Sequence, residues 1–359
     1  MKTWQKGLTI NDQTFNFKEL LAFSSDNIVS ANTPPWEKEI YRFMITWLSD
    51  SDYIVQFSSG TTGKSKEIRL PKQSMMISAR NTCRYFSLHK DNTALLCMPV
   101  DYIAGRMMIV RSLVGELNLY LTEPTSTPDI SSSQPIDFCA MVPLQVMNLL
   151  NFRTDLNPIK NLIIGGAEIS TALEKLLLDI PTTVYATYGM AETCSHVAFR
   201  KFNGPGRQKT YHALSGVTLA QDERGCLLLT ATYLPGQIVT NDLVEFTGPG
   251  SFIWLGRYDN LINSGGIKIV PEEMEALIIE KTGLICAIIG LPDDRLGQRP
   301  VLVLEKKPEL SEITIKRLVE KLFPHNKQPK EIAWVEEMPR NDSYKLDRRK
   351  LTEMVLKYQ

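Results

Sequence analysis

The stretch "YIVQFSSGTTGKSKEIRLP", Tyr53 to Pro71, decides how the fold is interpreted. Its glycines, hydroxyls and lysines are typical of a phosphate-binding loop. A Walker loop needs a glycine, four residues and then Gly-Lys-Ser/Thr, but only two residues separate Gly60 from Gly63. Apolar Tyr53–Phe57 and the alternating run that ends at Pro71 predict two strands. We therefore expect a glycine-rich hairpin able to bind a polyphosphate, with an ordinary exposed turn as the alternative.

Composition places the chain among ordinary globular proteins. The 359 residues suffice for two or more domains. The 40 basic residues balance the 40 acidic ones, so no surface for nucleic acid is expected. The sequence has no apolar run long enough for a membrane span and no signal-peptide core at its start. We expect a cytoplasmic protein with reduced thiols, because the six cysteines form no CxxC pair: Cys83, Cys97, Cys139, Cys194, Cys226 and Cys286.

The order of expected elements predicts an α/β fold. Apolar strands alternate with helical segments between about residues 72 and 190, a pattern typical of parallel βαβ units. From about residue 211, short alternating segments predict an antiparallel sheet or a small barrel. The last 100 or so residues alternate strand and helix again, which predicts a small α+β domain.

Polar or glycine-rich patches follow several apolar strands, where open α/β sheets usually bind ligands. These patches are Ser58–Lys66, Gly165–Glu168, Tyr188–Thr193, Thr240–Asp242, Gly256–Gly266 and, near the end of the chain, Pro339–Leu351.

The patches carry a family resemblance. The motifs "SSGTTGKSK", "YGMAET", "TNDL", "GRYDNLINSGGIKIVPEEME" and "PRNDSYKLDRRKL" occur in this order. Together they closely resemble the acyl- and aryl-CoA synthetases of the adenylate-forming superfamily over about residues 50–359. The resemblance implies ATP and Mg²⁺ as cofactors and CoA as a substrate. It also implies an α/β adenylation domain with a small barrel-like part (1–257, shortened at its N-terminus) and a mobile α+β lid domain (258–359).

The resemblance assigns nucleotide-binding roles to two sets of residues. The ATP phosphates are expected at Ser59, Gly60, Thr61, Thr62, Gly63, Lys64 and Lys66. Adenine and ribose are expected at Gly166, Ala167, Glu168, Tyr188, Gly189, Asp242 and Arg257. Glu192 matches the magnesium-binding glutamate, and a hard oxygen ligand suits Mg²⁺ that bridges phosphates. Ala191 and Asn241 replace the threonine and glycine usual in the family.

The resemblance also implies that the lid domain swings between two half-reactions. Lys345 would bridge the attacking carboxylate and the α-phosphate, although it also lies in a basic tail. Asp259 matches the hinge position, and Gly265 and Gly266 would line the channel for CoA. Tyr344 stands where the family has glycine, which allows backbone angles that tyrosine avoids.

The run "DYIAGRMMIVR" (Asp101–Arg111), together with "AETCSHVAFR" (Ala191–Arg200), resembles the short o-succinylbenzoate–CoA ligases of menaquinone biosynthesis. That acid has a second carboxylate, which an arginine can bind through a fork of donors. Arg106 or Arg111 would supply the fork, and Ser195 and His196 are further pocket candidates. The alternative interpretations are a surface arginine for Arg106 and a structural residue for His196.

The predicted reaction converts o-succinylbenzoate, ATP and CoA to o-succinylbenzoyl-CoA, AMP and pyrophosphate. Three alternatives stay open at this point: a ligase for another acyl or aryl acid, an enzyme that loads a carrier protein, and a degenerate nucleotide-binding relative. The expected partners are small-molecule substrates, with a homodimer as an additional prediction.

Overall fold

The computed structural model describes residues 2–57, 66–131, 135–152, 156–167, 169–305, 311–340 and 346–357. The predictions for Ser59–Lys64, Glu168, Tyr344 and Lys345 lie outside the described residues. The chain divides into two compact units. The first unit comprises Met1–Ile169, Leu176–Leu219 and Leu229–Ile238, and the second comprises Ser170–Lys175, Ala220–Leu228 and Val239–Gln359.

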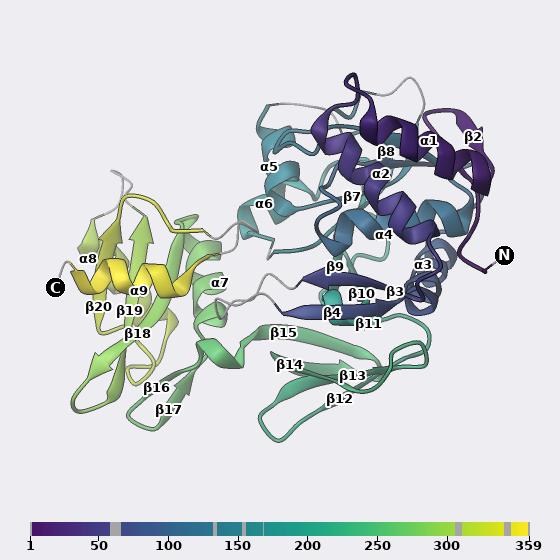
Figure 1. The fold of residues 1–359 in the computed structure, drawn as a ribbon. Coiled ribbons are helices and arrows are strands. Elements are labelled where there is room, and N and C mark those ends of the chain that lie inside the picture. Colours follow the sequence, from purple (N-terminus) through teal and green to yellow (C-terminus); the bar gives the residue numbers. More distant parts are fainter. Residues whose placement is uncertain are drawn as a thin grey trace. The chain divides into compact units, whose positions relative to one another are not determined.

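A mainly parallel sheet forms the centre of the first unit (Figure 1). Its strands lie in the order β11-β10-β9-β8-β7-β5-β6-β1-β2. Neighbouring strands from β9 to β1 run parallel, whereas β10 and β2 pair antiparallel with β9 and β1. The predicted α/β fold is therefore confirmed. The strands are β1 (Leu8–Ile10), β2 (Gln13–Phe15), β5 (Thr93–Leu96), β6 (Asn118–Leu121), β7 (Ile136–Met141), β8 (Ile159–Ile164), β9 (Thr183–Gly189), β10 (His196–Lys201) and β11 (Tyr211–Ala213).

Two helices near the start of the chain begin at local capping signals. Asn16 and Glu19 form a reciprocal capping box at the start of α1, and Pro35 is the first residue of α2. In Figure 1, α1 packs beside α2, and α3 beside α4. The helices are α1 (Phe17–Val29), α2 (Pro35–Leu48), α3 (Lys72–Tyr85), α4 (Ile103–Gly115), α5 (Pro143–Asn151) and α6 (Thr171–Leu176).

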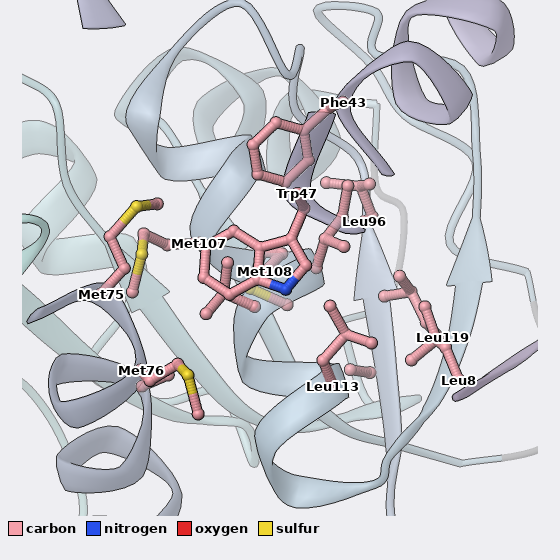
Figure 2. Packing of buried hydrophobic residues seen from close by; sticks show 14 of the residues in the cluster. Leu8, Phe43, Trp47, Met75, Met76, Leu96, Met107, Met108, Leu113 and Leu119 are labelled. Atoms are coloured by element: carbon pink, nitrogen blue, oxygen red, sulfur yellow. The ribbon is translucent and has the colours of Figure 1, made fainter. Parts of the chain in front are cut away.

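The core of the first unit is rich in methionine and tryptophan. Figure 2 shows the indole of Trp47, from α2, beside Met107 and Met108 of α4. All three side chains are at most 1% exposed, and the Trp47 Nε1–H donates to the carbonyl of Trp4 at 3.2 Å. Flexible thioethers fill irregular gaps around a rigid indole. This packing fixes α3 and α4, which carry the buried polar residues of the site described below.

The predicted hairpin forms a separate two-stranded sheet of β3 (Tyr53–Phe57) and β4 (Glu67–Pro71). The strands pair antiparallel from Tyr53↔Pro71 to Phe57↔Glu67. Phe57 and Glu67, which flank residues 58–66 in the sequence, are therefore directly paired. The hairpin part of the prediction is confirmed.

The second unit contains an antiparallel pair and a smaller mixed sheet. In the pair, β14 (Ile238–Gly248) and β15 (Ser251–Arg257) run antiparallel, and β12 (Val217–Gln221) and β13 (Cys226–Ala231) cross the boundary between the units. The smaller sheet has the order β17-β16-β19-β18, with β20 parallel to β19. Its elements are η2 (Tyr258–Asn260), β16 (Ile262–Ser264), β17 (Ile267–Ile269), α7 (Pro271–Thr282), β18 (Cys286–Asp293), β19 (Gly297–Glu305), α8 (Glu312–Leu322), β20 (Glu331–Val335) and α9 (Arg348–Lys357).

Strand β18 shows how the small sheet buries both faces. Cys286 and Ile288 pack in one cluster with residues of α7 and α8, whereas Ala287 and Ile289 pack in another with residues of α9. Successive side chains of a strand point to opposite faces, so an unbroken apolar run predicts a strand covered on both sides. The predicted α+β texture of this region is confirmed.

The division into compact units differs from the predicted domain boundary. The second unit includes β14 and β15, whereas the boundary predicted from the sequence lies after Arg257. The predicted boundary concerns which part swings about Asp259, and it stays a prediction. No helix within the described ranges is long and apolar enough to cross a membrane.

Candidate active site

The carboxyl ends of β8 and β9 bring several predicted residues to one edge of the sheet. Strand β8 ends at Ile164 and is followed by Gly166 and Ala167, and β9 ends at Gly189. The two strands are parallel neighbours with Ile164 opposite Ala186. Segments that follow parallel strands meet at the same edge, which is the usual ligand-binding edge of an open α/β sheet.

Two glycines at this edge are required by the backbone. Gly166 has a φ of +84°, in the left-handed region that glycine occupies without penalty. A Cβ on Gly189 would lie 2.4 Å from the Ser195 carbonyl oxygen and 2.5 Å from His196 Cα. Glycine at position 189 thus lets the chain at Ser195 and His196 pass directly against the end of β9.

Tyr188, the predicted adenine-stacking residue, is 9% exposed. It pairs with Ala198 on β10, and its ring lies 6.0 Å from that of Tyr211 in an edge-to-face arrangement. The Arg200 guanidinium lies over the Tyr211 ring at 5.6 Å. Tyr188 therefore packs against the ring of Tyr211, and its contact with adenine stays a prediction.

Glu192 lies on the short 3₁₀ helix η1 (Ala191–Thr193), directly after β9. Within the described part of the chain, its carboxylate makes no hydrogen bond or ion pair, and no cluster of three His, Cys, Asp or Glu residues surrounds it. Mg²⁺ usually binds through one or two carboxylates and substrate phosphates rather than an all-protein cage. A carboxylate with no partner among the described residues fits a magnesium ion delivered with ATP.

A buried polar cluster centred on Arg111 lies between α3, α4 and β10. Arg111 is 1% exposed, and its Nη2 donates to Ser195 Oγ at 2.6 Å. Its Nε–H lies 3.4 Å from Thr82 Oγ1. Among the described residues no carboxylate lies within ion-pair distance of this guanidinium. Burial lowers the pKa of Arg111 to about 10, so the side chain remains a cation at neutral pH.

His196 completes this cluster. It is 5% exposed, its Nε2 lies 2.8 Å from Thr82 Oγ1 and its Nδ1 lies 3.4 Å from Arg111 Nη2. Burial, and then the charge of Arg111, hold the pKa of His196 well below its usual value. A neutral ring with Nδ1 as acceptor must carry its proton on Nε2, which then donates to Thr82. The cluster therefore holds one cation and no charged imidazole.

Arg106 is engaged differently. Its Nε–H donates to the Val100 carbonyl and its Nη1–H to the Val55 carbonyl, both at 2.7 Å. The guanidinium also lies 5.4 Å from the centre of the Phe43 ring. These bonds tie α4 to β3, at the base of the glycine-rich hairpin. A role for Arg106 in acid binding stays a prediction. Among the described contacts, the guanidinium of Arg111 donates to no carbonyl and pairs with no carboxylate.

The predicted ribose residues meet in the second unit. Asp242 and Arg257 are opposite each other on β14 and β15, with Arg257 Nη1 lying 3.5 Å from Asp242 Oδ1. The indole N–H of Trp254 donates to the same oxygen at 3.2 Å. Asp242 is 6% exposed. Trp254 and Arg257 thus both orient the carboxylate, and Trp254 carries no motif that marks it in the sequence.

The predicted hinge residue, Asp259, is held by two neighbours. Asn241 Nδ2 donates to Asp259 Oδ1 at 2.7 Å, and Arg257 Nη2 donates to Oδ2 at 2.7 Å. The asparagine that replaces the family's glycine therefore contacts the hinge position directly.

The predicted CoA-channel glycines form the turn between β16 and β17. Gly265 and Gly266 have φ values of +60° and +83°, and they connect the pair Ser264↔Ile267. Two consecutive positive φ angles characterise a type I′ hairpin turn. A Cβ on Gly266 would meet nothing within 4 Å, so glycine serves the backbone angle here, and passage of CoA stays a prediction.

Thr82 was not identified from the sequence. It lies on α3, 0% exposed, and bridges Arg111 and His196. A threonine on a helix gives no distinctive pattern. Because α3 also buries the polar Ser74 and Ser78, one more buried hydroxyl on this helix does not stand out in the sequence.

Comparison with known proteins identifies relatives of this arrangement. Residues 8–223 match the family described as AMP-binding enzyme. A 2-succinylbenzoate–CoA ligase of Bacillus cereus is 24% identical over 96% of this chain and 78% of its own length. The crystal structure of an acyl-CoA synthetase (AMP-forming)/AMP-acid ligase II-like protein of Dyadobacter fermentans is 34% identical, covers 91% of this chain and 95% of its own, and superposes with a TM-score of 0.60. The o-succinylbenzoate CoA synthetase of Bacillus subtilis, solved with an acyl-adenylate, has a TM-score of 0.77 at 16% identity, over 98% of this chain and 96% of its own.

Proposed function

The chain belongs to the AMP-binding enzyme family of adenylate-forming acid–CoA ligases, and we propose that the acid it activates is 2-succinylbenzoate, the o-succinylbenzoate of menaquinone biosynthesis. The cofactors are ATP with Mg²⁺, and CoA is the second substrate. The 2-succinylbenzoate–CoA ligase of Bacillus cereus, aligned along 96% of this chain, supports this choice of acid. The cytoplasmic location and the homodimer stay predictions.

The observation that carries the choice of acid is the buried guanidinium of Arg111. Burial of a cation is costly unless a partner compensates it, and the described residues provide hydroxyl and imidazole groups but no carboxylate. A dicarboxylic acid brings one carboxylate for the reaction and a second for this cation. Monocarboxylic fatty and benzoic acids lack the second group.

The chemistry proceeds in two half-reactions. A carboxylate oxygen first bonds to the α-phosphorus of ATP, and the bond from that phosphorus to pyrophosphate breaks. The CoA sulfur then bonds to the acyl carbon, the bond to AMP breaks, and the thiol proton leaves. The first step joins two anions, so it needs cations and oriented donors rather than a protein nucleophile.

The chain's own residues have distinct roles in the first half-reaction. Lys66, directly before β4, and the loop before it would hold the phosphates, with Lys345 at the α-phosphate. Glu192 would hold Mg²⁺, which neutralises phosphate charge when bound. Asp242 would accept the ribose hydroxyls, since its carboxylate is already oriented by Trp254 and Arg257.

A panel of acids tests the proposal. The enzyme is incubated with ATP, Mg²⁺, CoA and one acid, and AMP release is followed. We expect 2-succinylbenzoate to give the highest kcat/KM and both of its monomethyl esters to react poorly. One ester blocks the activated carboxylate, and the other removes the partner of Arg111. Turnover of a fatty or benzoic acid, with 2-succinylbenzoate inert, would overturn the choice of acid.

A further inference from the structure

The first residue of α9, Arg348, is the centre of a buried ionic cluster that the family motifs leave without a role. Its Nη1 and Nη2 donate to the two oxygens of Glu275 at 2.8 and 2.7 Å. Nη2 also lies 3.4 Å from Glu272 Oε1. Glu272 and Glu275 are 5% and 7% exposed. A two-point arginine–carboxylate bond fixes orientation as well as distance.

The cluster attaches α9 to two other elements. Glu272 and Glu275 lie on α7, and Arg348 Nη1 also donates to the Ile288 carbonyl of β18 at 2.9 Å. The Ile288 amide in turn donates to Glu275 Oε1 at 2.6 Å. The arginine and the glutamate therefore satisfy both backbone groups of Ile288 on β18, the last strand in the order of the smaller sheet. Rotation of α9 away from β18 would break all of these bonds together.

The backbone just before Arg348 is held as well. Leu346 forms an isolated β-bridge with Arg340, and the Asp347 amide donates to the Pro339 carbonyl at 2.8 Å. Asp347 Oδ1 accepts the Lys350 amide at 2.9 Å, in the manner of a helix cap. Lys345 precedes Leu346 directly in the chain. The held backbone therefore begins one residue after the lysine predicted to act in the first half-reaction.

The same cluster reaches the residue that follows the predicted hinge. Asn260 Nδ2 donates to Glu272 Oε1 at 2.5 Å, and Asn260 is the neighbour of Asp259. One chain of contacts thus runs from Asn260 through Glu272 to Arg348 and on to the start of α9. A movement about Asp259 would therefore move Glu272, Arg348 and the start of α9 together.

We propose that Arg348 is a positioning residue for adenylation. By bonding to Glu275 and Glu272, it fixes the backbone next to Lys345 against α7 and the predicted hinge. Lys345 would then reach the α-phosphate in one geometry. The proposal rests on the proposed function. A displacement of about 1 Å far from the reacting atoms can cost about 100-fold in rate. Lysine cannot replace the arginine, because a single ammonium does not reproduce the planar fork that meets Glu275 and Ile288 together.

The test compares Arg348→Lys with Arg349→Ala. Arg349 is the next residue, its side chain is 84% exposed, and it pairs only with Glu353 on the same helix among the described contacts. Two rates are measured for each protein: pyrophosphate release from ATP and 2-succinylbenzoate, and thioester formation from supplied acyl-adenylate and CoA. Thermal unfolding is recorded alongside. A double variant, Arg348→Met with Glu275→Leu, removes both charges of the buried pair, and its thermal unfolding shows whether it is folded before its rates are compared.

We expect Arg348→Lys and the double variant to lose about 100-fold in pyrophosphate release and less than threefold in thioester formation, with Arg349→Ala unchanged in both. Equal loss of both rates, or retention of pyrophosphate release in a folded variant, would overturn the positioning role. A wild-type enzyme that releases no pyrophosphate with any acid would instead overturn the proposed function. The two failures are therefore distinguishable.

Discussion

Arg111 Nη2 lies 2.6 Å from Ser195 Oγ, and this bond joins α4 to the segment that follows the family motif "YGMAET". The arginine is fully buried, and the described residues around it are neutral. Such a cation costs free energy in the folded protein unless a ligand compensates it. If Arg111 binds the second carboxylate of the acid, as proposed, its burial costs stability in the free enzyme that the bound acid offsets.

Replacing Arg111 by Met should separate these two effects. Because the apolar side chain removes an uncompensated buried charge, we expect the melting temperature to stay equal or rise. We expect kcat/KM for 2-succinylbenzoate to fall by about 100-fold or more, which corresponds to about 3 kcal/mol of a charge-assisted bond. The KM for ATP should change little. The measurements are thermal unfolding and steady-state kinetics.

Arg80→Met on α3 is the matched control, since Arg80 is exposed. It should leave the melting temperature and both kinetic constants near those of the wild type. A clear drop in the melting temperature of Arg111→Met, with the acid kinetics unaffected, would show that Arg111 is a structural residue.

His196 predicts how stability depends on pH. Its pKa is well below the usual value of about 6.5 because the ring is buried and faces Arg111. Below pH 6.5 the unfolded chain therefore binds a proton that the folded chain excludes, so this histidine makes stability fall as pH falls. Between pH 7.5 and 5.5 the loss should be roughly 1 kcal/mol in the free energy of unfolding.

Denaturant unfolding at the two pH values, for the wild type and His196→Gln, checks this expectation. The glutamine variant should lose less stability on acidification, by about the amount stated above, whereas the exposed-site variant His89→Gln should follow the wild type. Identical pH dependence in the wild type and His196→Gln would show that the pKa of His196 is the same in the folded and unfolded protein.

The bond from Asn241 to Asp259 should affect the relative rates of the two half-reactions. Its bond to Asp259 is worth about 1 kcal/mol net, so Asn241→Ala should shift the ratio of pyrophosphate release to thioester formation by up to about fivefold. The KM for the acid should stay unchanged. Val239→Ala, on the same strand with a 61% exposed side chain, is the control. An unchanged ratio would show that the bond from Asn241 to Asp259 does not affect the movement about the hinge.

Local patterns in the sequence were sufficient to predict most of the fold. The hairpin on either side of residues 58–66 followed from an apolar run, an alternating run and a proline, and β3 and β4 pair there. The alternation of strand and helix predicted for the last 100 or so residues includes β18 and β19, and the apolar residues of both strands are buried on two faces. Local pattern suffices in these cases because each element's burial is encoded within its own residues.

The site was predicted less completely, because its contacts join residues far apart in the chain. Thr82 reaches His196 across 114 positions, and no local pattern reports such a bond. Arg106 and Arg111 belong to the same helix and look equivalent in the sequence. Only the folded chain shows that Arg106 donates to two backbone carbonyls whereas Arg111 faces Ser195 and His196.

Lys72 should give a second pH dependence of stability, in the alkaline range rather than the acidic range of His196. Its Nζ is buried and donates to the carbonyls of Thr46 and Ser49 at 3.1 and 3.0 Å, at the end of α2. Burial, and then the charge of Lys2, lower the pKa of Lys72 to about 8. Between pH 8 and about 10.5 the unfolded chain retains a proton that the folded chain has lost. The stability contributed by this residue should therefore rise with pH across that window and be flat below it.

Unfolding free energies of the wild type and Lys72→Met at pH 7, 8, 9 and 10 measure the effect as their difference, and Lys90→Met, at an exposed position, is the control. The difference should move in favour of the wild type above pH 8. A constant difference from pH 7 to 10 would mean that Lys72 keeps its ordinary pKa, and that its three carbonyl and hydroxyl acceptors fully offset its burial.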